Sequence, residues 1–259
     1  MCRWVGYVGA DAPLAPLVFG GDQSLLRQSW APRELLSGSV NADGWGVVWW
    51  AEGAPRRLAG SRPLWQEEGL QDVLEVTRSR CALAALRNTT PGIPGDASGN
   101  PPLVLEGRSF VLNGYVPEFR HRHMRALRRG LSDERYAALS GSSDTETLFL
   151  LVLEALAAGA DRSAALRQAA DAVVARLEEG QEAQLTMALA DGTGLTALST
   201  SSVDRTNSLY LARRHPVLPG AVLASEALED GAEWTPVPAH AVVRLDAGGA
   251  RVEPEAGES

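Results

Sequence analysis

The amino-acid sequence predicts an α/β fold of the α+β kind, in which β-sheets pack face to face and helices cover their outer sides. Segments rich in β-forming residues occupy both ends of the chain, and two helical segments lie between them. This order is typical of one layered domain. At 259 residues the chain can bury a core without disulfides or metals. We expect one domain over residues 2–250 and a short polar tail over residues 251–259.

Two strands and a helix are predicted in the first third of the chain. Residues 3–8 form a strand that leads from the N-terminus into the core. Residues 45–50 are rich in Trp and Val, which favour strands, and they follow an Asp-Gly turn. Residues 66–80 have apolar side chains at helical spacing. The predicted core face of that helix comprises Leu70, Val73, Leu74 and Thr77.

Short buried strands over residues 81–86 and 109–112 flank a loop over residues 91–102 that is rich in Gly and Pro. Residues 144–158 are strongly apolar and predict a helix buried between layers. A second helix is predicted over residues 161–179, because its apolar side chains recur at helical spacing. Further strands are predicted over residues 184–190, 195–200, 209–212, 221–224 and 241–245.

Composition and charge exclude several function classes. A net charge of −8 argues against nucleic acid as the main partner, since phosphate binding needs a basic surface. No signal peptide is recognisable, and the most apolar stretch, residues 148–160, is too short to span a bilayer. We therefore expect a cytoplasmic protein that does not enter a membrane. Cys81 lies in an apolar run and is interpreted as an inert core thiol.

No cofactor or metal is expected. Neither a phosphate-binding Gly-Lys loop nor a Gly-x-Gly-x-x-Gly run occurs in the sequence. His121 and His123 have weak metal-ligand spacing and no nearby cysteine or acidic partner. The basic segment around them, residues 120–129, is interpreted as a solvated helix face. Attraction of an anionic substrate, or a contact between subunits of a homo-oligomer, is left open.

Cys2 is a candidate nucleophile, although its position alone is weak evidence. If its small side chain allows the removal of Met1, one residue offers both a thiol and a free α-amine. An α-amine has a pKa of about 7.7–8.0, so part of it is unprotonated near neutrality. Nucleophile and base then come from the same residue, as in the N-terminal variant of nucleophilic catalysis.

Asn113 and Gly114 are candidate donors to an oxyanion. They follow the predicted strand over residues 109–112, so we expect the chain to turn there. A side-chain amide and a backbone N–H at such a turn can point at one oxygen, and losing one donor of this kind costs about 2.7–4 kcal/mol of transition-state stabilisation. The alternative interpretation is an ordinary Asn-Gly turn.

A glutamyl substrate carries an α-carboxylate and an α-ammonium at its fixed end. Arg87 can bind the carboxylate with two hydrogen bonds, and Thr90 adds a hydroxyl. Asp144 can face the ammonium. Ser143 and Glu146 have capping-box spacing, which would hold Asp144 at the start of a helix. Outside this set, Ser225 and Glu226 are interpreted as a surface turn, as are Asp230 and Glu233.

The order of these motifs resembles the class II glutamine amidotransferases, and the resemblance runs from Cys2 to about Leu245. Its motifs are Met1-Cys2-Arg3, Asn41-Ala42-Asp43-Gly44-Trp45-Gly46, Arg87-x-x-Thr90, Asn113-Gly114, Ser143-Asp144 and Ala224-Ser225-Glu226-Ala227-Leu228. The resemblance implies a four-layer αββα sandwich of two antiparallel sheets, of the N-terminal-nucleophile hydrolase type. It also implies Cys2 as nucleophile, Asn113 and Gly114 as oxyanion hole, and Arg87, Thr90 and Asp144 as the glutamyl-binding residues.

A narrower resemblance is to the γ-glutamyl amidohydrolases of ergothioneine biosynthesis. It is carried by Arg27-Gln28-Ser29-Trp30-Ala31-Pro32-Arg33, by the Asn-Ala-Asp-Gly-Trp-Gly run over residues 41–46, and by Asn100-Pro101-Pro102. This implies a small-molecule substrate, γ-glutamyl-hercynylcysteine sulfoxide. The sequence departs from that pattern at Trp4 and Leu112, where the family usually has histidine, so we expect a reshaped pocket. Two alternatives stay open: the glutaminase chain of a two-chain amidotransferase, and an inactive binding module of the same fold.

Overall fold

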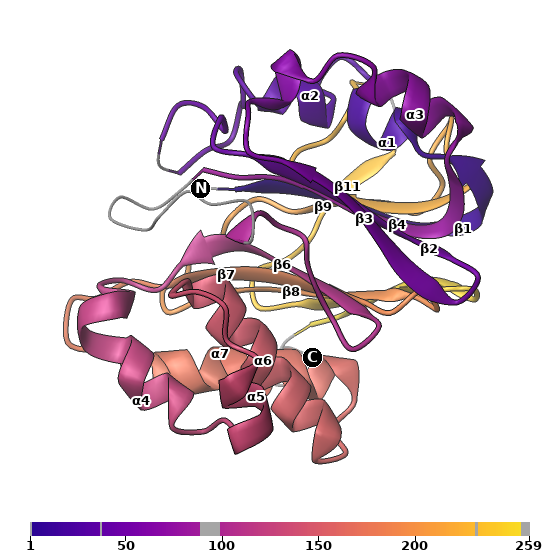
Figure 1. Ribbon diagram of the computed structural model, residues 1–259. Helices are drawn as coiled ribbons and strands as arrows, with labels where there is room; N and C mark the ends of the chain where they lie inside the picture. The colour runs from indigo at the N-terminus through magenta and orange to yellow at the C-terminus, as the bar shows by residue number, and fades with distance from the viewer. Residues whose placement is uncertain (1, 37, 89–98, 231–232, 255–259) are drawn as a thin grey trace.

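The computed structural model is a sandwich of two antiparallel β-sheets with a layer of helices on each outer side (Figure 1). It describes residues 2–36, 38–88, 99–230 and 233–254. The predicted four-layer αββα arrangement is confirmed.

The first sheet places the N-terminal strand at its centre. Its strands are β1 (Arg3–Pro13), β2 (Trp45–Ala51), β3 (Ala54–Gly60), β4 (Arg78–Leu86), β9 (Tyr210–Ala212), β10 (Gly220–Ala224) and β11 (Trp234–Pro236). They lie in the order β11-β9-β10-β1-β4-β2-β3. Because β1 pairs with β10 on one side and β4 on the other, Cys2 lies at the end of a central strand.

The second sheet places the Asn113 segment next to a fully buried strand. Its strands are β5 (Leu103–Leu105), β6 (Arg108–Tyr115), β7 (Gln184–Ala190), β8 (Leu195–Ser201), β12 (Val242–Asp246) and β13 (Gly249–Glu253). Their order is β13-β12-β8-β7-β6-β5. Every residue of β7 is buried, as expected for a strand that is covered on both faces.

The helices form the two outer layers (Figure 1). Over the first sheet lie α1 (Ala15–Phe19), α2 (Leu25–Gln28), the 3₁₀-helix η1 (Leu64–Gln66) and α3 (Leu70–Val76). Over the second sheet lie the π-helix η3 (Phe119–His123), α4 (Met124–Arg128), α5 (Asp133–Ala137), α6 (Asp144–Ala157) and α7 (Arg162–Val174). Among the described residues, no helix is long and apolar enough to cross a membrane.

Three apolar cores lie between the four layers. A strand contributes side chains to two of these cores, one on each face of its sheet. On β1, Trp4 and Val8 point between the sheets, whereas Val5 and Tyr7 point toward the helices of the first layer. This alternation is the two-residue period of a strand. Cys81 is buried in the core between the sheets, as predicted, and burial raises the pKa of its thiol to about 12.

Several predicted elements are confirmed, among them β2, β7 and α6. The helix predicted over residues 66–80 is wrong at both ends, since α3 is short and residues from 78 onward belong to β4. Pairing of β4 with β1 overrides the helical spacing there. Val73 was expected to face the core but is 46% exposed, whereas Leu70 and Leu74 are buried.

Two further expectations concern the end of the domain and the exposure of the basic segment. Strand β13 extends to Glu253, so the sheet continues beyond the expected domain boundary at residue 250. The basic segment folds as η3 and α4, and most of its charged side chains are exposed, as predicted. Two side chains are exceptions. His123 is buried, with its Nε2 2.9 Å from Oε1 of Gln181, and the Arg128 side chain is only 12% exposed.

Candidate active site

Cys2 lies where β1 begins, beside the end of β4. The first strand pair there joins Arg3 to Leu86, and the Cys2 thiol reaches the carbonyl oxygen of Asn88 at 4.0 Å. Burial raises the pKa of the Cys2 thiol, and the neighbouring Arg87 guanidinium opposes that rise. The thiol is therefore protonated near neutrality, and its use as a nucleophile requires a base.

Asn113 is fully buried and faces Cys2 from the second sheet. The orientation of its amide that satisfies both ends has the nitrogen donating to the Cys2 carbonyl oxygen at 2.6 Å. The amide oxygen then accepts from Nη1 of Arg3 at 3.2 Å. This orientation is assigned from the hydrogen-bond network. An amide nitrogen has two N–H groups, so one is not used by the Cys2 carbonyl. Gly114 is among the residues that line the cavity beside Cys2, whereas Asn113 is not.

The turn expected at Asn113 is wrong, because β6 continues through Tyr115. Asn113 and Gly114 pair with Thr186 and Leu185 of β7. At Gly114 the two strands approach closely: a Cβ atom there would lie 1.7 Å from the backbone oxygen of Gln184. Glycine is thus required at this position by the close approach of β7 rather than by a hairpin.

Arg87 extends β4 toward Cys2, and its side chain is held by Asn100. Its Nη1 donates to the Asn100 Oδ1 at 3.0 Å, and the Asn100 amide donates to the Gly60 carbonyl at 2.7 Å. The backbone N–H of Arg87 donates to the carbonyl of Gly44. Gly44 lies against the Asn100 side chain, where a Cβ would come within 2.6 Å.

Arg57 of β3 is a site-supporting residue that the sequence interpretation missed. Its Nε donates to the Pro102 carbonyl at 3.0 Å and its Nη2 to the Asn100 carbonyl at 2.6 Å. These bonds hold the Asn-Pro-Pro segment from its backbone side, with the Asn100 side chain turned to Arg87. The strand β3 that carries Arg57 was not predicted, so no sequence signal indicated this contact.

Asp144 is the first residue of α6 and is buried at the site. Its Oδ2 accepts from the backbone N–H of Val116 at 3.1 Å, and its Oδ1 accepts from that of Thr145 at 2.8 Å. Burial raises the pKa of its carboxyl group, while these N–H donors oppose the rise. A bound cation would offset the cost of burying this charge.

The predicted capping box is half correct. The Ser143 hydroxyl accepts from the backbone N–H of Glu146 at 3.1 Å, which caps α6. The Glu146 carboxylate turns instead to the preceding loop and accepts from the backbone N–H groups of Ser140 and Gly141. The cap still fixes Asp144 in the first turn.

The predicted thiol, guanidinium and carboxylate line a single cavity. Its lining comprises Cys2, Arg87, Asn88, Gly99, Pro101, Leu112, Gly114, Ser143, Asp144 and Thr145. Thr90, which was predicted to belong to this set, lies outside the described residues.

The two departures from the family pattern have different positions. Leu112 lines the cavity, so an apolar side chain stands where a histidine was expected. Trp4 is buried in the core between the sheets and is not among the lining residues. Of the two replacements, Leu112 is therefore the one that shapes the pocket.

Ser225 and Glu226 contradict the surface-turn interpretation, since both are buried, beside Trp4 and Arg3 of β1. The Ser225 hydroxyl accepts from the backbone N–H of Trp4 at 3.0 Å, which continues the pairing of β1 beyond β10. Glu226 lies against Arg3. The only signal for this placement was the match of Ala224 to Leu228 with the family motif. Asp230 and Glu233 are exposed, as expected.

Two face-to-face antiparallel sheets with Cys2 at the start of the central strand define an N-terminal-nucleophile type of sandwich. The chain belongs to the class II glutamine amidotransferase family, whose model matches residues 22–229. A γ-glutamyl-hercynylcysteine sulfoxide hydrolase of Mycobacterium tuberculosis is 31% identical over 95% of this chain and 93% of its own. The enzyme of that name from Mycolicibacterium smegmatis is 33% identical over 92% of each chain.

Comparison of structures gives the same fold. A class II glutamine aminotransferase domain protein from Silicibacter pomeroyi superimposes with a TM-score of 0.73. The match covers 98% of this chain and 100% of that one, at 24% sequence identity.

The close approach at Gly114 gives a direct test of the site geometry. Gly114→Ala places a Cβ against a backbone oxygen that cannot move without shifting β7, so we expect a loss of about 1–3 kcal/mol in unfolding free energy, with loss of activity. Gly107→Ala is the matched control, because Gly107 also has a positive φ but has open space around its Cβ position. Equal stability of the two variants in denaturant unfolding would contradict the close approach.

Proposed function

We propose that this protein hydrolyses a γ-glutamyl amide bond, with Cys2 as the nucleophile after removal of Met1. The observation that carries the proposal is the cavity lined by Cys2, Arg87 and Asp144. A glutamyl group has a carbonyl for a thiolate, a carboxylate for a guanidinium and an ammonium for a carboxylate. The three side chains match these three groups.

The reaction proceeds through a thioester. The α-amine of Cys2 takes the proton of the thiol, and the sulfur attacks the γ-carbonyl carbon. The oxyanion that forms accepts hydrogen bonds from the Asn113 amide and the Gly114 backbone N–H. The C–N bond then breaks, and the leaving amine takes the proton. Water attacks the thioester with the same α-amine as base, which releases glutamate and restores the thiol.

The fixed end of the substrate is held by opposite charges. Arg87 binds the α-carboxylate with its position set by Asn100, and Asp144 binds the α-ammonium. Thr90 was predicted to belong to the same substrate-binding set, but it lies outside the described residues. A substrate that brings an ammonium to Asp144 also offsets the cost of burying the charge of its carboxylate. The buried carboxylate therefore favours binding of such a substrate.

The substrate we propose is γ-glutamyl-hercynylcysteine sulfoxide, which would place the enzyme in ergothioneine biosynthesis. The two mycobacterial hydrolases are 31% and 33% identical to this chain over nearly the full length of each partner. Leu112 lines the same cavity and gives the pocket an apolar wall.

Glutamate release by protein with its native N-terminus tests this proposal. We expect faster release from γ-glutamyl-hercynylcysteine sulfoxide than from glutamine, and a loss on the order of 10⁴-fold or more in Cys2→Ala, because the nucleophile is removed. Cys81→Ala is the control and is expected to keep full activity, since that thiol is in the core. Substantial turnover by Cys2→Ala would exclude Cys2 as nucleophile, and release from glutamine alone would refute the proposed substrate.

The buried Asp144 predicts the pH dependence of substrate capture. Its carboxyl pKa is raised by burial, and the protonated form cannot attract an ammonium. As pH falls through that raised pKa, we expect KM for the γ-glutamyl substrate to rise, beginning above the ordinary aspartate value of about 3.9. In Asp144→Asn, KM should be high at every pH and should lose this acid-side dependence. An unchanged KM profile in that variant would show that Asp144 does not bind the substrate.

A further inference from the structure

Arg3 and Glu226 form an ion pair that is completely withdrawn from solvent. The Nε of Arg3 lies 3.0 Å from Oε1 of Glu226, and the two side chains are 0% and 1% exposed. Removing two charges from water costs several kcal/mol per ion unless further hydrogen bonds compensate. A hydrophobic pair of similar volume would fill this space at lower cost, so the charges call for an explanation beyond packing.

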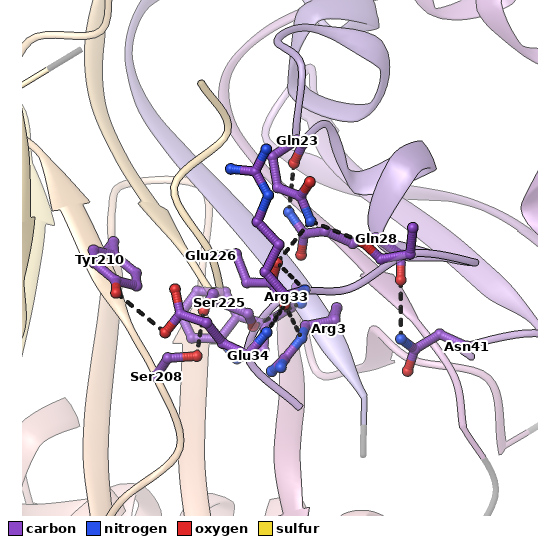
Figure 2. A network of polar contacts seen from close by, with 12 residues as sticks. Arg3, Gln23, Gln28, Arg33, Glu34, Asn41, Ser208, Tyr210, Ser225 and Glu226 are labelled. Atoms are coloured by element: carbon purple, nitrogen blue, oxygen red, sulfur yellow. Dashed lines mark hydrogen bonds and ion pairs between the residues drawn. The ribbon is translucent and has the colours of Figure 1, made fainter. Parts of the chain in front are cut away.

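Glu226 accepts hydrogen bonds from residues on both sides of α2, Gln23 before it and Arg33 and Glu34 after it (Figure 2). Its carboxylate accepts from Nε2 of Gln23 at 2.8 Å and from the backbone N–H of Glu34 at 3.0 Å. The backbone N–H of Arg33 donates to both carboxylate oxygens, at 2.9 and 3.1 Å. The carboxylate is thereby fixed from several directions, and it presents one oxygen to Arg3.

Arg3 lies between Glu226 and the side chain of Asn113, the proposed oxyanion donor. Its Nη1 lies 3.2 Å from the Asn113 oxygen, and the nitrogen of the same amide lies 2.6 Å from the Cys2 carbonyl oxygen. An amide rotated by half a turn would place its oxygen, not its N–H, beside Cys2. It would then repel a developing oxyanion instead of stabilising it. The guanidinium permits only one of the two orientations, because it has donors and no acceptor.

We propose that Glu226 is a positioning residue, which acts through Arg3 to hold the Asn113 amide with its N–H groups directed at the reacting carbonyl. This inference rests on the proposed amide hydrolysis. Glu226 lies behind Arg3 and is not among the residues that line the cavity. It therefore acts on the transition state only through the orientation of Asn113, and the glutamyl-binding residues Arg87 and Asp144 are independent of it.

The test compares Glu226→Gln, Glu226→Asp and Arg3→Lys with the wild-type enzyme. Each variant is measured for kcat and KM with the γ-glutamyl substrate and for the rate of Cys2 alkylation by iodoacetamide. Alkylation develops no oxyanion, so it reports on the thiol alone. We expect kcat of Glu226→Gln to fall ~10²–10³-fold, as for the loss of one oxyanion donor, with KM and the alkylation rate nearly unchanged.

The conservative variants separate orientation from charge. Glu226→Asp keeps the carboxylate and should regain part of the lost kcat. Arg3→Lys keeps a cation for Glu226 but lacks the guanidinium that spans to Asn113, so it should lose kcat as Glu226→Gln does. If Glu226→Gln fails to fold, Arg3→Lys alone decides. Glu106→Gln is the control, since it disrupts the ion pair with Arg135 at the opposite end of β6 and should leave kcat unchanged.

Two results would overturn the proposal. Full kcat in Arg3→Lys or in a folded Glu226→Gln would show that the pair does not orient Asn113. Parallel loss of kcat and of Cys2 alkylation would show that the pair only maintains the fold around the thiol. A wild-type protein that releases no glutamate would overturn the proposed function as well, whereas an active wild type with an equally active Glu226→Gln overturns the positioning role alone.

Discussion

The pairing of β1 with both β4 and β10 is the constraint on which the site depends. It places the start of the chain in the middle of the first sheet, with Arg87 at the end of β4 on one side and Ser225 after β10 on the other. A terminus usually frays unless it is tied into a sheet. Here strands on both sides hold β1, so Cys2, which directly precedes β1, is kept beside the end of β4.

Packing of the second sheet against β1 completes the arrangement. The side chains of Trp4, Val8 and Val111 fill the space between the sheets, and Asn113 follows on the same face of β6 as Val111. Apolar packing therefore sets the distance between the thiol and the amide, while the charges of Arg3 and Glu226 set the direction of the amide. The distance between the thiol and the amide and the orientation of the amide thus have separate physical causes. We therefore expect that a variant can lose the orientation and keep the distance.

The order of layers could be predicted from the sequence, and so could four residues that line one cavity, namely Cys2, Arg87, Gly114 and Asp144. Arg87 and Asp144 belong to local motifs at the ends of regular elements. Such motifs can be recognised from neighbouring residues in the sequence, without knowledge of the fold. Glu226 could not be predicted correctly from its own neighbours. Its Ser-Glu dipeptide looks like an exposed turn, and it is buried only because β10 lies beside β1. The contact of Arg57 with Asn100 likewise depends on β3. This edge strand was not predicted, because its Pro and Arg residues are not typical of a strand.

We infer that Cys2, as the first residue of the mature chain, attacks a γ-glutamyl carbonyl in this cavity. The most direct test is to incubate the native protein with an electrophilic γ-glutamyl analogue that alkylates thiols, and then to map the adduct by mass spectrometry. We expect one adduct, on an N-terminal peptide that begins at Cys2 and lacks Met1, and we expect the γ-glutamyl substrate to protect Cys2 from labelling. An adduct on Cys81, or an unlabelled chain that retains Met1, would contradict it.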